Sequence, residues 1–323
     1  MQKQGAFVVL NVLFAIFLMN FDYKALQNYG RNLYIFNAIM LLLVMIIGQT
    51  ALGAQRWIQL GPITLQPSEF SKIIMIIALA SMLEDRVGKL NTVSDILPVV
   101  GYVALPFFLV LKQPDLGTSL VFIAILLGMM FVAGVNLRIL AAGFAAGVAA
   151  SPLLWLFLKD YQKMRLKVFL DPSVDPLGSG YHIIQSKIAI GSGLIFGKGL
   201  FGGTQSQLNF LPENHTDFIF AVVGEELGFV GAAILLALYL VVLWRGVKIA
   251  QEASDTFGQL LAVGITSMLA FHVLVNVGMT TGIMPVTGIP LPLMSYGVSS
   301  LTTNLIAITI LLNIHMRKAK FVF

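Results

Sequence analysis

The stretch LPENHTDFIFAVVGEELG, residues 211–228, contains the pattern that decides the fold of this chain. The polar cluster that leads into its apolar segment FIFAVVG consists of Glu213, His215, Thr216 and Asp217. Two more acids, Glu225 and Glu226, follow that segment. A carboxylate beside lipid is costly unless it is paired or takes part in chemistry. The stretch therefore predicts a membrane helix with a paired or functional acid at its N-terminal end.

The composition of the whole chain indicates an integral membrane protein. Of its 323 residues, 58% are hydrophobic and only 11% are charged, whereas a soluble globular protein carries about 25% charged residues. The absence of cysteine excludes disulfides and thiol catalysis, and no pair among the 4 histidines has zinc-ligand spacing. The net charge of +5 comes from basic residues at the ends of apolar runs, which is a signal of membrane orientation and not of nucleic-acid binding.

About nine apolar runs approach the roughly 20 residues that a membrane-spanning helix needs. They lie near 6–21, 33–48, 69–84, 96–111, 117–134, 139–158, 217–244, 257–281 and 299–316. Strands of a membrane barrel would alternate in polarity at every second residue, which these runs do not. We therefore predict an all-α, polytopic membrane protein that forms a single domain over residues 1–323.

Basic residues in the short loops predict which side of the membrane each loop faces. One set of alternate loops carries Lys24, Arg86, Arg138, Arg245 and Arg317. The positive-inside rule places this set in the cytoplasm, so the long loop 159–216 and the N-terminus are extracytoplasmic. A start outside the membrane without a leader leads us to expect that one preceding helix is missing. The segment 181–200 is amphipathic and predicts a helix on the outer membrane surface.

Asp217 is the main candidate for catalysis. Thr216 is predicted to cap the helix that begins here, with His215 before it, so Asp217 is a helix-start acid favoured by the helix dipole. The alternative is a general base, or a carboxylate that positions a sugar hydroxyl or a metal. Helical spacing predicts that Asp217 and Glu225 lie on one side of the helix. Glu226 is expected to point elsewhere and to pair with a basic residue or another helix.

Two further loop motifs contain charged residues. In LQPSEFSKI, Ser68 is predicted to cap a helix, and Glu69 and Lys72 have the i, i+3 spacing of an ion pair. The alternative is that Lys72 binds a phosphate from a water-filled cavity and that Glu69 orients it. In KQPDLGTS, Asp115 and Thr118 are typical of a helix start, and the alternative is that Asp115 contacts the substrate.

The C-terminal stretch GIMPVTGIPLPLMSYGVSS, residues 282–300, is rich in proline and glycine. Backbone this irregular is tolerated at membrane depth only where it lines a cavity or packs inside protein. Ser295 is a candidate contact for a polar headgroup, and simple loop packing accounts for it equally well. His272, in the apolar run LAFHVLVNVG, is predicted to be a core histidine with Asn276 as its hydrogen-bond partner.

From about residue 6 to the C-terminus, the chain resembles the SEDS family of membrane proteins. The motifs that carry the resemblance are RWIQLGPITLQPSEFSK (56–72), KQPDLGTSL (112–120), DPLGSGYHIIQSKIAIGSG (175–193), GTQSQLNFLPENHTDFIFAVVGEELG (203–228) and PVTGIPLPLMSYGVSS (285–300). Val298 stands where the family generally has glycine. The family has ten spans, one more than the count predicted here.

The resemblance implies a peptidoglycan glycosyltransferase that polymerises lipid II, an undecaprenyl-diphosphate-linked disaccharide peptide, outside the bacterial cytoplasmic membrane. The forms GTQSQLNFLPE and TGIPLP are closer to family members of cell elongation than to those of division. The resemblance also implies that Asp217 is the essential acid and that Glu69 and Lys72 are a functionally sensitive pair. A class B penicillin-binding protein and other elongation-complex membrane proteins are the implied partners. Mg²⁺ or Mn²⁺ is an implied aid to activity, and no motif forms a site for it.

The family chemistry implies a mechanism with one displacement. Its donor sugar is α-linked to a diphosphate and its product is β-linked, so a base acts on the acceptor hydroxyl. We expect Asp217 to be this base and Lys72 to stabilise the leaving diphosphate. Basic residues of the long loop, Arg165, Lys187 and Lys198, are expected to guide the anionic headgroup. The predicted substrate-binding residues are Glu69, Lys72, Asp115, Lys187, His215, Thr216 and Ser295.

Two functions of other classes are compatible with the same pattern. One is a flippase or transporter of lipid-linked precursors, and the other is a scaffold that only holds a transpeptidase. A flippase should place its charges along a path through the membrane midplane, whereas the candidate residues lie at the predicted outer ends of helices, which favours the enzyme. A scaffold predicts that Asp217 is dispensable.

Overall fold

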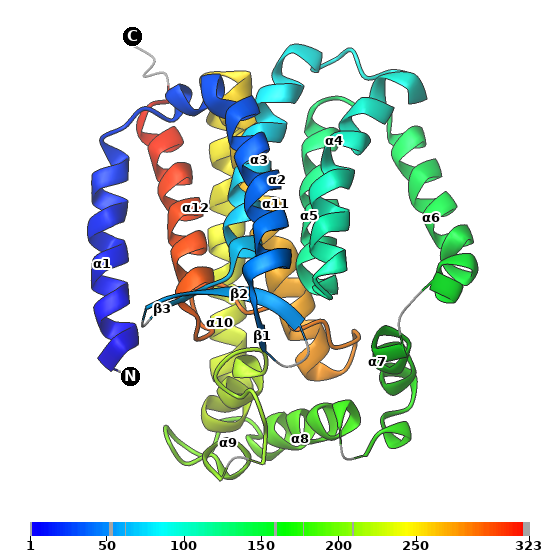
Figure 1. Ribbon diagram of the computed structural model, residues 1–323. Helices are drawn as coiled ribbons and strands as arrows, with labels where there is room; N and C mark the ends of the chain where they lie inside the picture. The colour runs from blue at the N-terminus through cyan, green and yellow to red at the C-terminus, as the bar shows by residue number, and fades with distance from the viewer. Residues whose placement is uncertain are drawn as a thin grey trace. The chain divides into compact units, whose positions relative to one another are not determined.

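The computed structural model describes residues 2–51, 54–61, 63–157, 160–176, 178–208 and 210–318 of the chain (Figure 1). Each of the nine apolar runs coincides with a helix. These helices are α1 (Gln2–Met19), α2 (Gly30–Ile47), α3 (Pro67–Leu83), α4 (Val93–Lys112), α5 (Leu116–Val132), α6 (Leu137–Phe157), α10 (Ile219–Glu252), α11 (Thr256–Thr281) and α12 (Val298–Met316). Five segments of the described chain are long and apolar enough to cross a membrane: Tyr23–Ile47, which ends with α2, and the helices α4, α10, α11 and α12. The predicted helical, polytopic architecture is confirmed.

The connections between these helices contain shorter elements. Between α2 and α3 lies a three-stranded antiparallel sheet in the order β1 (Gln49–Ala51), β2 (Ala54–Leu60), β3 (Ile63–Leu65), where the sequence pattern predicted only a loop. Strands β1 and β3, of 3 residues each, are too short for periodicity to indicate them, and the sequence of β2, AQRWIQL, does not alternate strictly between apolar and polar residues. The other short elements are η1 (Tyr23–Tyr29), η2 (Glu84–Arg86), α7 (Asp160–Leu170), η3 (Pro172–Val174), α8 (Ser179–Ser192) and α9 (Thr204–Gln207).

The chain divides into two compact units. The first unit consists of Met1–Ala141, Leu243–Phe271 and Gly297–Phe323, and the second of Ala142–Val242 and His272–Tyr296. Helices α10 and α11 each contribute residues to both units. The units are therefore not consecutive domains along the sequence, and the single-domain organisation stays a prediction.

Helix α3 is the central helix of the first unit. It packs against α2, α4, α5 and α12, and the side chains of Met75, Ile76 and Leu79 are 0% exposed. A helix that is apolar all round is expected at such a position, because every side of it is buried. The charged residues at the start of α3 are therefore held inside protein and not at a solvated surface.

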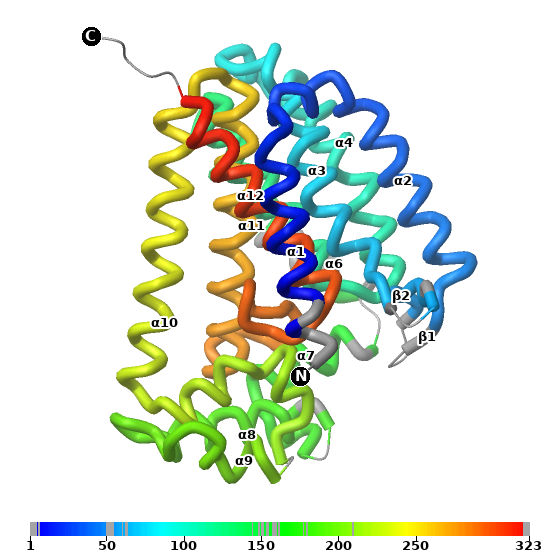
Figure 2. Tube along the Cα trace, turned by 90° about the vertical axis from the view of Figure 1, so that its left-hand side faces the viewer, coloured from blue at the N-terminus to red at the C-terminus, as the bar shows by residue number. Residues whose placement is uncertain are grey.

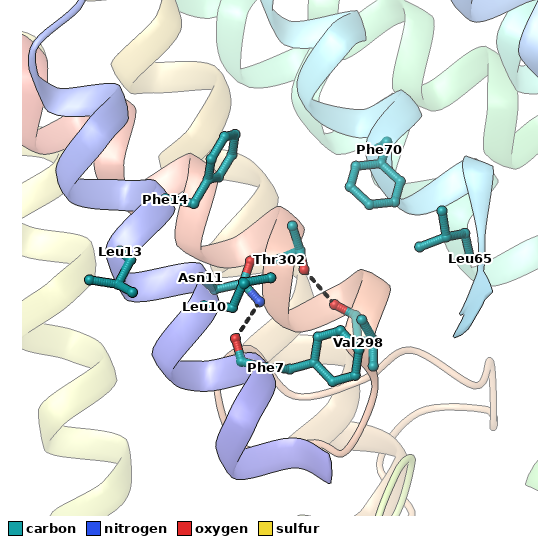
Figure 3. A pocket seen from close by; sticks show the side chains of 9 residues that line it. All are labelled: Phe7, Leu10, Asn11, Leu13, Phe14, Leu65, Phe70, Val298 and Thr302. Carbon is teal, nitrogen blue, oxygen red and sulfur yellow. Dashed lines mark hydrogen bonds between the residues drawn. The ribbon is translucent and has the colours of Figure 1, made fainter. Parts of the chain in front are cut away.

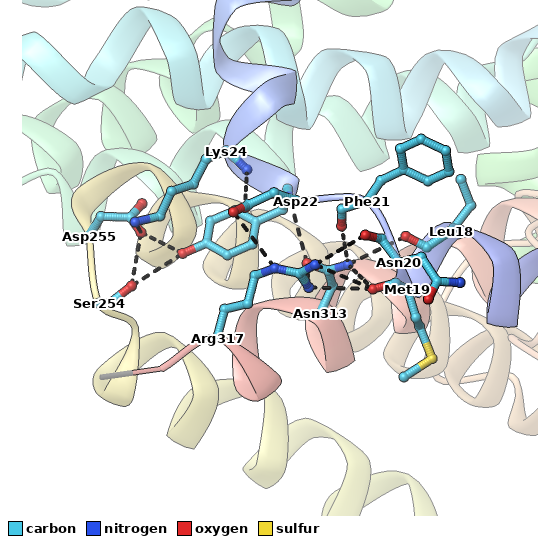
Figure 4. A network of polar contacts seen from close by, with 11 residues as sticks. Leu18, Met19, Asn20, Phe21, Asp22, Lys24, Ser254, Asp255, Asn313 and Arg317 are labelled. Carbon is cyan, nitrogen blue, oxygen red and sulfur yellow. Dashed lines mark hydrogen bonds and ion pairs between the residues drawn. The ribbon is translucent and has the colours of Figure 1, made fainter. Parts of the chain in front are cut away.

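The side chains of Asn313 and Arg317, at the end of α12, form hydrogen bonds with the end of α1 (Figure 4). The side-chain amide of Asn313 donates to three carbonyls, those of Leu18 (3.4 Å), Met19 (3.2 Å) and Phe21 (2.7 Å). Arg317 donates to the Met19 carbonyl at 3.4 Å and to Oδ1 of Asn313 at 2.7 Å. The last carbonyls of a helix have no partner within it, so these side chains cap α1.

Replacing Asn313 with alanine is expected to lower the midpoint of thermal unfolding. Asn313 is 4% exposed, and each buried polar group left without a partner costs roughly 1–3 kcal/mol. Thermal unfolding of the detergent-purified protein measures the effect. Leu312→Ala is the matched control, because Leu312 is 43% exposed on the same helix. Equal shifts for the two variants would contradict the capping role.

Helix α10 is broken near its start, within the predicted run 217–244. Gly228 has φ 65° and ψ −164°, a backbone conformation that favours glycine. The main chain of residues 194–199 supplies the hydrogen bonds that the break removes. These bonds, at 2.9 to 3.1 Å, join Lys198 N to Glu225 O, Gly199 N to Glu226 O, Phe229 N to Leu194 O and Val230 N to Ile195 O. A break in an apolar helix needs such partners, since lipid offers none.

Candidate functional site

Asp217 lies in a turn directly before α10 and not in the first turn of that helix, which begins at Ile219. Thr216 does not cap the helix. Its hydroxyl donates to Oε2 of Glu213 at 2.9 Å, and the turn closes on itself through Phe218 N, which donates to the Glu213 carbonyl at 3.2 Å. The predicted Thr216 cap and the predicted helix-start position of Asp217 are therefore wrong.

The turn that carries Asp217 is held by three hydrogen bonds from α11 and the loop that follows α11. They run from Tyr296 N to His215 O (2.8 Å), from Ser295 Oγ to Thr216 O (2.6 Å) and from Asn276 Nδ2 to Asp217 O (2.9 Å). Three consecutive carbonyls thus have partners from the same part of the second unit. The main chain of the turn is fixed just where the Asp217 side chain leaves it.

The Asp217 carboxylate lies against the main chain of the TGIP loop. Gly288 has φ +74°, and a Cβ built on it would lie 3.2 Å from Oδ2 of Asp217. Glycine is required there both by the left-handed conformation and by the close approach. Arg165 of α7 donates to the carbonyl of the preceding residue, Thr287, at 3.2 Å. Asp217 is only half-buried.

A small apolar core packs against the turn and includes its residue Phe218. Its members, including two half-buried side chains, are Ala189, Leu211, Phe218, Ala221, Ile190 and Val286. His182 of α8 stacks on Phe218 with ring centroids 5.8 Å apart. Burial holds the pKa of the His182 imidazole below its usual value, although the carboxylates Glu213 and Asp175 oppose this effect. The imidazole next to the turn is therefore neutral at pH 7.

The predicted amphipathic helix over 181–200 is shorter than expected, because α8 ends at Ser192 and turns follow it. Figure 2 shows α8 close to α9. Lys187, a predicted substrate contact, is exposed on α8. Its side chain extends over Gly282, since a Cβ built there would lie 2.6 Å from Lys187 Nζ. A cationic group is thus presented at the surface of the unit that contains Asp217.

Glu225 is a buried acid whose partners come from residues 198–206. Its carboxylate, on a residue that is 0% exposed, accepts from Lys198 Nζ (2.9 Å), Thr204 Oγ1 (3.2 Å), Gln205 N (2.9 Å), Ser206 N (3.0 Å) and Ser206 Oγ (2.9 Å). Asp217 precedes the helix, so helical spacing does not support the predicted shared side with Glu225, which stays a prediction. Glu226 accepts from Gln207 of α9 at 3.1 Å, which matches the prediction of a partner on another helix.

In the first unit, Glu69 and Lys72 form the predicted ion pair, with Nζ and Oε1 2.8 Å apart. The two residues are 3% and 1% exposed. The cap of α3 is Gln66 and not the predicted Ser68, whose hydroxyl donates to Oδ2 of Asp115 at 3.4 Å. Oε2 of Glu69 is buried and has no hydrogen-bond partner among the described residues.

Asp115 caps α5, as predicted. Its carboxylate accepts from Thr118 N at 3.1 Å and from Thr118 Oγ1 at 3.0 Å. Gln66 donates to it at 3.1 Å, and Arg56 of β2 forms an ion pair with it at 3.9 Å. These contacts tie the starts of α3 and α5 to the sheet. A substrate contact by Asp115 stays a prediction.

The predicted site residues thus fall into two groups. Asp217, His215, Thr216, Lys187 and Ser295 belong to the second unit, and Glu69, Lys72 and Asp115 to the first. Asn276 and Gly288 also lie next to Asp217, and the sequence pattern does not assign them there. The available signal was the amide of Asn276 in an apolar run. The sequence predicts that this amide pairs with His272, which is a core residue at 1% exposed, whereas Nδ1 of His272 lies 3.1 Å from the Pro290 carbonyl.

An apolar pocket of about 520 Å³ lies in the first unit (Figure 3). Its lining residues are Phe7, Leu10, Asn11, Leu13, Phe14, Leu65, Phe70, Val298 and Thr302. The Asn11 amide donates to the Phe7 carbonyl at 2.8 Å, so it is satisfied within α1. Since no lining residue is titratable, this pocket is not the candidate catalytic site.

Nor does the structure indicate where Mg²⁺ or Mn²⁺ would bind. Within the described ranges, no three His, Asp or Glu side chains form a group that could hold a metal ion. Divalent cations of this kind prefer several oxygen ligands together. The described residues therefore do not fit a resident metal, and we derive no step through one.

Over residues 1–320 the sequence matches the family of cell cycle proteins FtsW, RodA and SpoVE. The chain belongs to this family. It is 42% identical over 319 residues to the peptidoglycan glycosyltransferase MrdB of Escherichia coli (strain K12), with 98% of this chain and 86% of the relative covered. It is 41% identical over 317 residues to stage V sporulation protein E of Bacillus subtilis (strain 168), with 97% and 86% covered.

A third FtsW/RodA/SpoVE relative is the probable peptidoglycan glycosyltransferase FtsW of Trichlorobacter lovleyi, 40% identical over 319 residues, with 97% of this chain and 83% of the relative covered. The predicted enzyme class, a peptidoglycan glycosyltransferase, is thereby confirmed. Identities of 42%, 41% and 40% are too similar to assign the chain to one branch of the family.

Solved structures show the same fold. A chain of a peptidoglycan synthase complex superposes with a TM-score of 0.84 at 34% identity, covering 99% of this chain and 90% of that chain. The rod shape determining protein RodA of Thermus thermophilus superposes with a TM-score of 0.73 at 32% identity, covering 99% of this chain and 88% of that chain. The arrangement of helices is therefore that of the FtsW/RodA/SpoVE family.

Proposed function

We propose that this enzyme polymerises lipid II into glycan strands on the outer face of the bacterial cytoplasmic membrane during cell elongation, the role of RodA and not of FtsW. The observation that carries the proposal is Asp217, a half-buried carboxylate directly before an apolar helix, in a turn fixed by three hydrogen bonds. The motifs GTQSQLNFLPE and TGIPLP support the elongation branch.

In the proposed reaction, Asp217 takes the proton from the 4-hydroxyl of the acceptor sugar. The oxygen of that hydroxyl attacks the anomeric carbon of the donor sugar, and the bond from this carbon to the diphosphate oxygen breaks on the opposite face. Undecaprenyl diphosphate leaves with the electron pair, and the configuration inverts from α to β. A positioned general base of this kind contributes typically about 10²–10⁴-fold to the rate.

Basic side chains are proposed to bind the anionic part of the substrate. Lys72 stabilises the leaving diphosphate with Glu69 orienting it, which preorganised cations do well in a water-poor site. Lys187 and Arg165 guide the headgroup, and the exposed position of Lys187 over Gly282 supports this role. Lys198 is held by Glu225 at 2.9 Å, so we assign it a structural role.

The remaining predicted contacts differ in what supports them. His215 has an exposed side chain in the turn of Asp217, which suits a contact with the sugar or peptide of the substrate. Thr216 is half-buried and its hydroxyl is bonded to Glu213. Asp115 is 4% exposed and holds the starts of α3 and α5 in place, and its contact with the substrate stays part of the proposal.

A class B penicillin-binding protein is the proposed partner, together with other membrane proteins of the elongation complex. The support is the similarity to a chain from a peptidoglycan synthase complex that coordinates polymerization and crosslinking. A polymerase at the outer membrane face delivers uncrosslinked strands, and a transpeptidase beside it would consume them. Membrane lipid surrounds the apolar helices, and no nucleic acid is involved.

The alternative function is a flippase for lipid-linked precursors. Transport sites lie near the membrane midplane, usually at interrupted helices. Here Glu69 lies in the first turn of α3, Asp115 caps α5 and Asp217 precedes α10. Charges at helix starts suit chemistry at a membrane surface better than a path across the membrane.

Polymerisation of labelled lipid II by the purified protein with its class B penicillin-binding protein tests the proposal. Glycan ladders are read on a gel, with a β-lactam present so that crosslinking does not obscure them. Ladders that require this protein are the expected result. Transfer of lipid II across vesicle membranes without any ladder would replace the polymerase with the flippase.

A further inference from the structure

Asn276 is a buried amide in the apolar part of α11. It is 0% exposed, and its Nδ2 donates to the Asp217 carbonyl at 2.9 Å and to the Ile289 carbonyl at 2.8 Å. The orientation of the amide follows from these partners, since a flipped amide would place its oxygen against two carbonyl oxygens. A buried polar side chain in an apolar helix is costly unless its hydrogen bonds are made. The Nδ2 of Asn276 donates to two loops at once, while its Oδ1 is buried without a hydrogen-bond partner among the described residues.

We propose that Asn276 is a positioning residue for Asp217, with Ser295 acting beside it; this inference rests on the proposed role of Asp217 as general base. One hydrogen of the Asn276 amide holds the main chain of Asp217. The other holds Ile289, which directly follows the Gly288 that lies against the Asp217 carboxylate. A single amide thereby sets the position of the base relative to the loop beside it.

Ser295 makes the parallel connection at the neighbouring residue. Its hydroxyl donates to the Thr216 carbonyl at 2.6 Å and accepts from Leu291 N at 2.8 Å. Ser295 is 3% exposed, and its hydroxyl both donates to and accepts from main-chain groups. We therefore assign Ser295 to holding the turn, which is the loop packing that the sequence left open beside a headgroup contact.

The consequence for catalysis follows from the geometry of proton transfer. A base must reach the acceptor hydroxyl within hydrogen-bond distance, and a displacement of about 1 Å can cost about 10²-fold in rate. The two hydrogen bonds that Asn276 donates go to the main chain of Asp217 and Ile289 and not to a side chain. Loss of Asn276 should therefore reduce turnover without weakening substrate binding.

Two isosteric variants, Asn276→Asp and Asn276→Leu, test this inference. Each removes both donated hydrogen bonds, and we expect kcat for lipid II polymerisation to fall about 10–100-fold with KM within about twofold of wild type. Thr280→Val is the matched control: Thr280 lies one turn further along α11, is equally buried, and its hydroxyl donates to the Asn276 and Val277 carbonyls of the same helix, while its own carbonyl, which accepts from Ser186, is unchanged by the substitution. We expect Thr280→Val to retain the wild-type rate. Equal losses in the control and the Asn276 variants, or a rise in KM that accounts for the loss, would overturn the inference.

Ser295 provides a second, independent comparison. Ser295→Thr keeps the hydroxyl and Ser295→Ala removes it, so we expect the threonine variant to be several-fold more active than the alanine variant. Wild-type activity in Ser295→Ala would remove Ser295 from the inference.

A double variant separates this inference from the proposed function. Residues that act as a unit are not additive, so Asn276→Leu should cause no further loss of the residual rate when added to Asp217→Asn. A further loss of tenfold or more in that background would show that Asn276 acts elsewhere. If Asp217→Asn alone polymerised at the wild-type rate, the proposed base would be wrong, whereas full activity of Asn276→Leu beside an inactive Asp217→Asn would overturn only the positioning role.

Discussion

Polymerisation of lipid II by an Asp217→Asn variant is expected to fall by about 10²–10⁴-fold, the usual contribution of a general base. Asparagine has the shape of aspartate but does not accept a proton at neutral pH. The hydrogen bonds that hold the turn go to the main-chain carbonyls of residues 215–217, so the substitution leaves them in place. The variant should therefore fold normally and bind its substrate while failing in turnover.

The matched control for Asp217→Asn is Glu213→Gln. Glu213 is an exposed acid of the same turn, and its replacement removes one negative charge there as well. Initial rates measured with labelled lipid II should stay within about threefold of wild type for Glu213→Gln, because that carboxylate is not the proposed base. If both variants lost activity equally, the turn would act through its total charge. If Asp217→Asn kept the wild-type rate, another residue would have to take the proton.

The membrane helices were predictable because a local property decides them. A run of apolar residues of sufficient length forms a helix wherever lipid or protein surrounds it, and the run 257–281 corresponds to α11 at Thr256–Thr281. The Glu69–Lys72 pair was equally predictable, since i, i+3 spacing within one helix brings the two side chains together. The cap of α5 by Asp115 depends on a side chain and a main-chain group three residues apart.

The features that escaped prediction depend on contacts between distant segments. The break at Gly228 is stable because residues 194–199 supply hydrogen bonds to it, and no pattern within the run 217–244 indicates those partners. Asp217 was assigned to the helix that follows, although the turn closes through Glu213 instead. The amide of Asn276 reaches a carbonyl 59 residues away. The sequence therefore indicates Asp217 as the candidate acid, and long-range hydrogen bonds in the structure hold the turn that carries it.

Breaking the Glu69–Lys72 pair from one side is expected to destabilise the protein by about 3–5 kcal/mol, because a charge then remains buried without its counterion. Lys72→Met leaves the carboxylate of a residue that is 3% exposed, and Glu69→Gln leaves the ammonium of one that is 1% exposed. The double variant removes both charges. A neutral pair of similar volume often restores the stability of a buried ion pair, so its unfolding midpoint should return close to that of wild type.

Thermal unfolding of the three variants in detergent measures this pattern. Lys248→Met is the matched control, since Lys248 pairs with Glu252 at 3.8 Å on a helix surface where the two side chains are 45% and 33% exposed. Solvent and flexible side chains weaken such a pair, so the control should unfold at the wild-type temperature. A double variant no more stable than its parents would show that the cost is in packing and not in charge.

The activity of the stable double variant then separates the two roles of the pair. A structural pair predicts wild-type polymerisation once stability is restored, whereas a pair that binds the diphosphate predicts a loss of about 10²-fold or more, as for other preorganised groups that stabilise charge in the transition state. Oε2 of Glu69 favours the second outcome, because it is buried without a partner among the described residues, and native proteins seldom leave such an atom unsatisfied unless it has another task. Full activity of the double variant would remove Lys72 from the proposed mechanism and leave Asp217 as the charged group proposed to act on the reacting atoms.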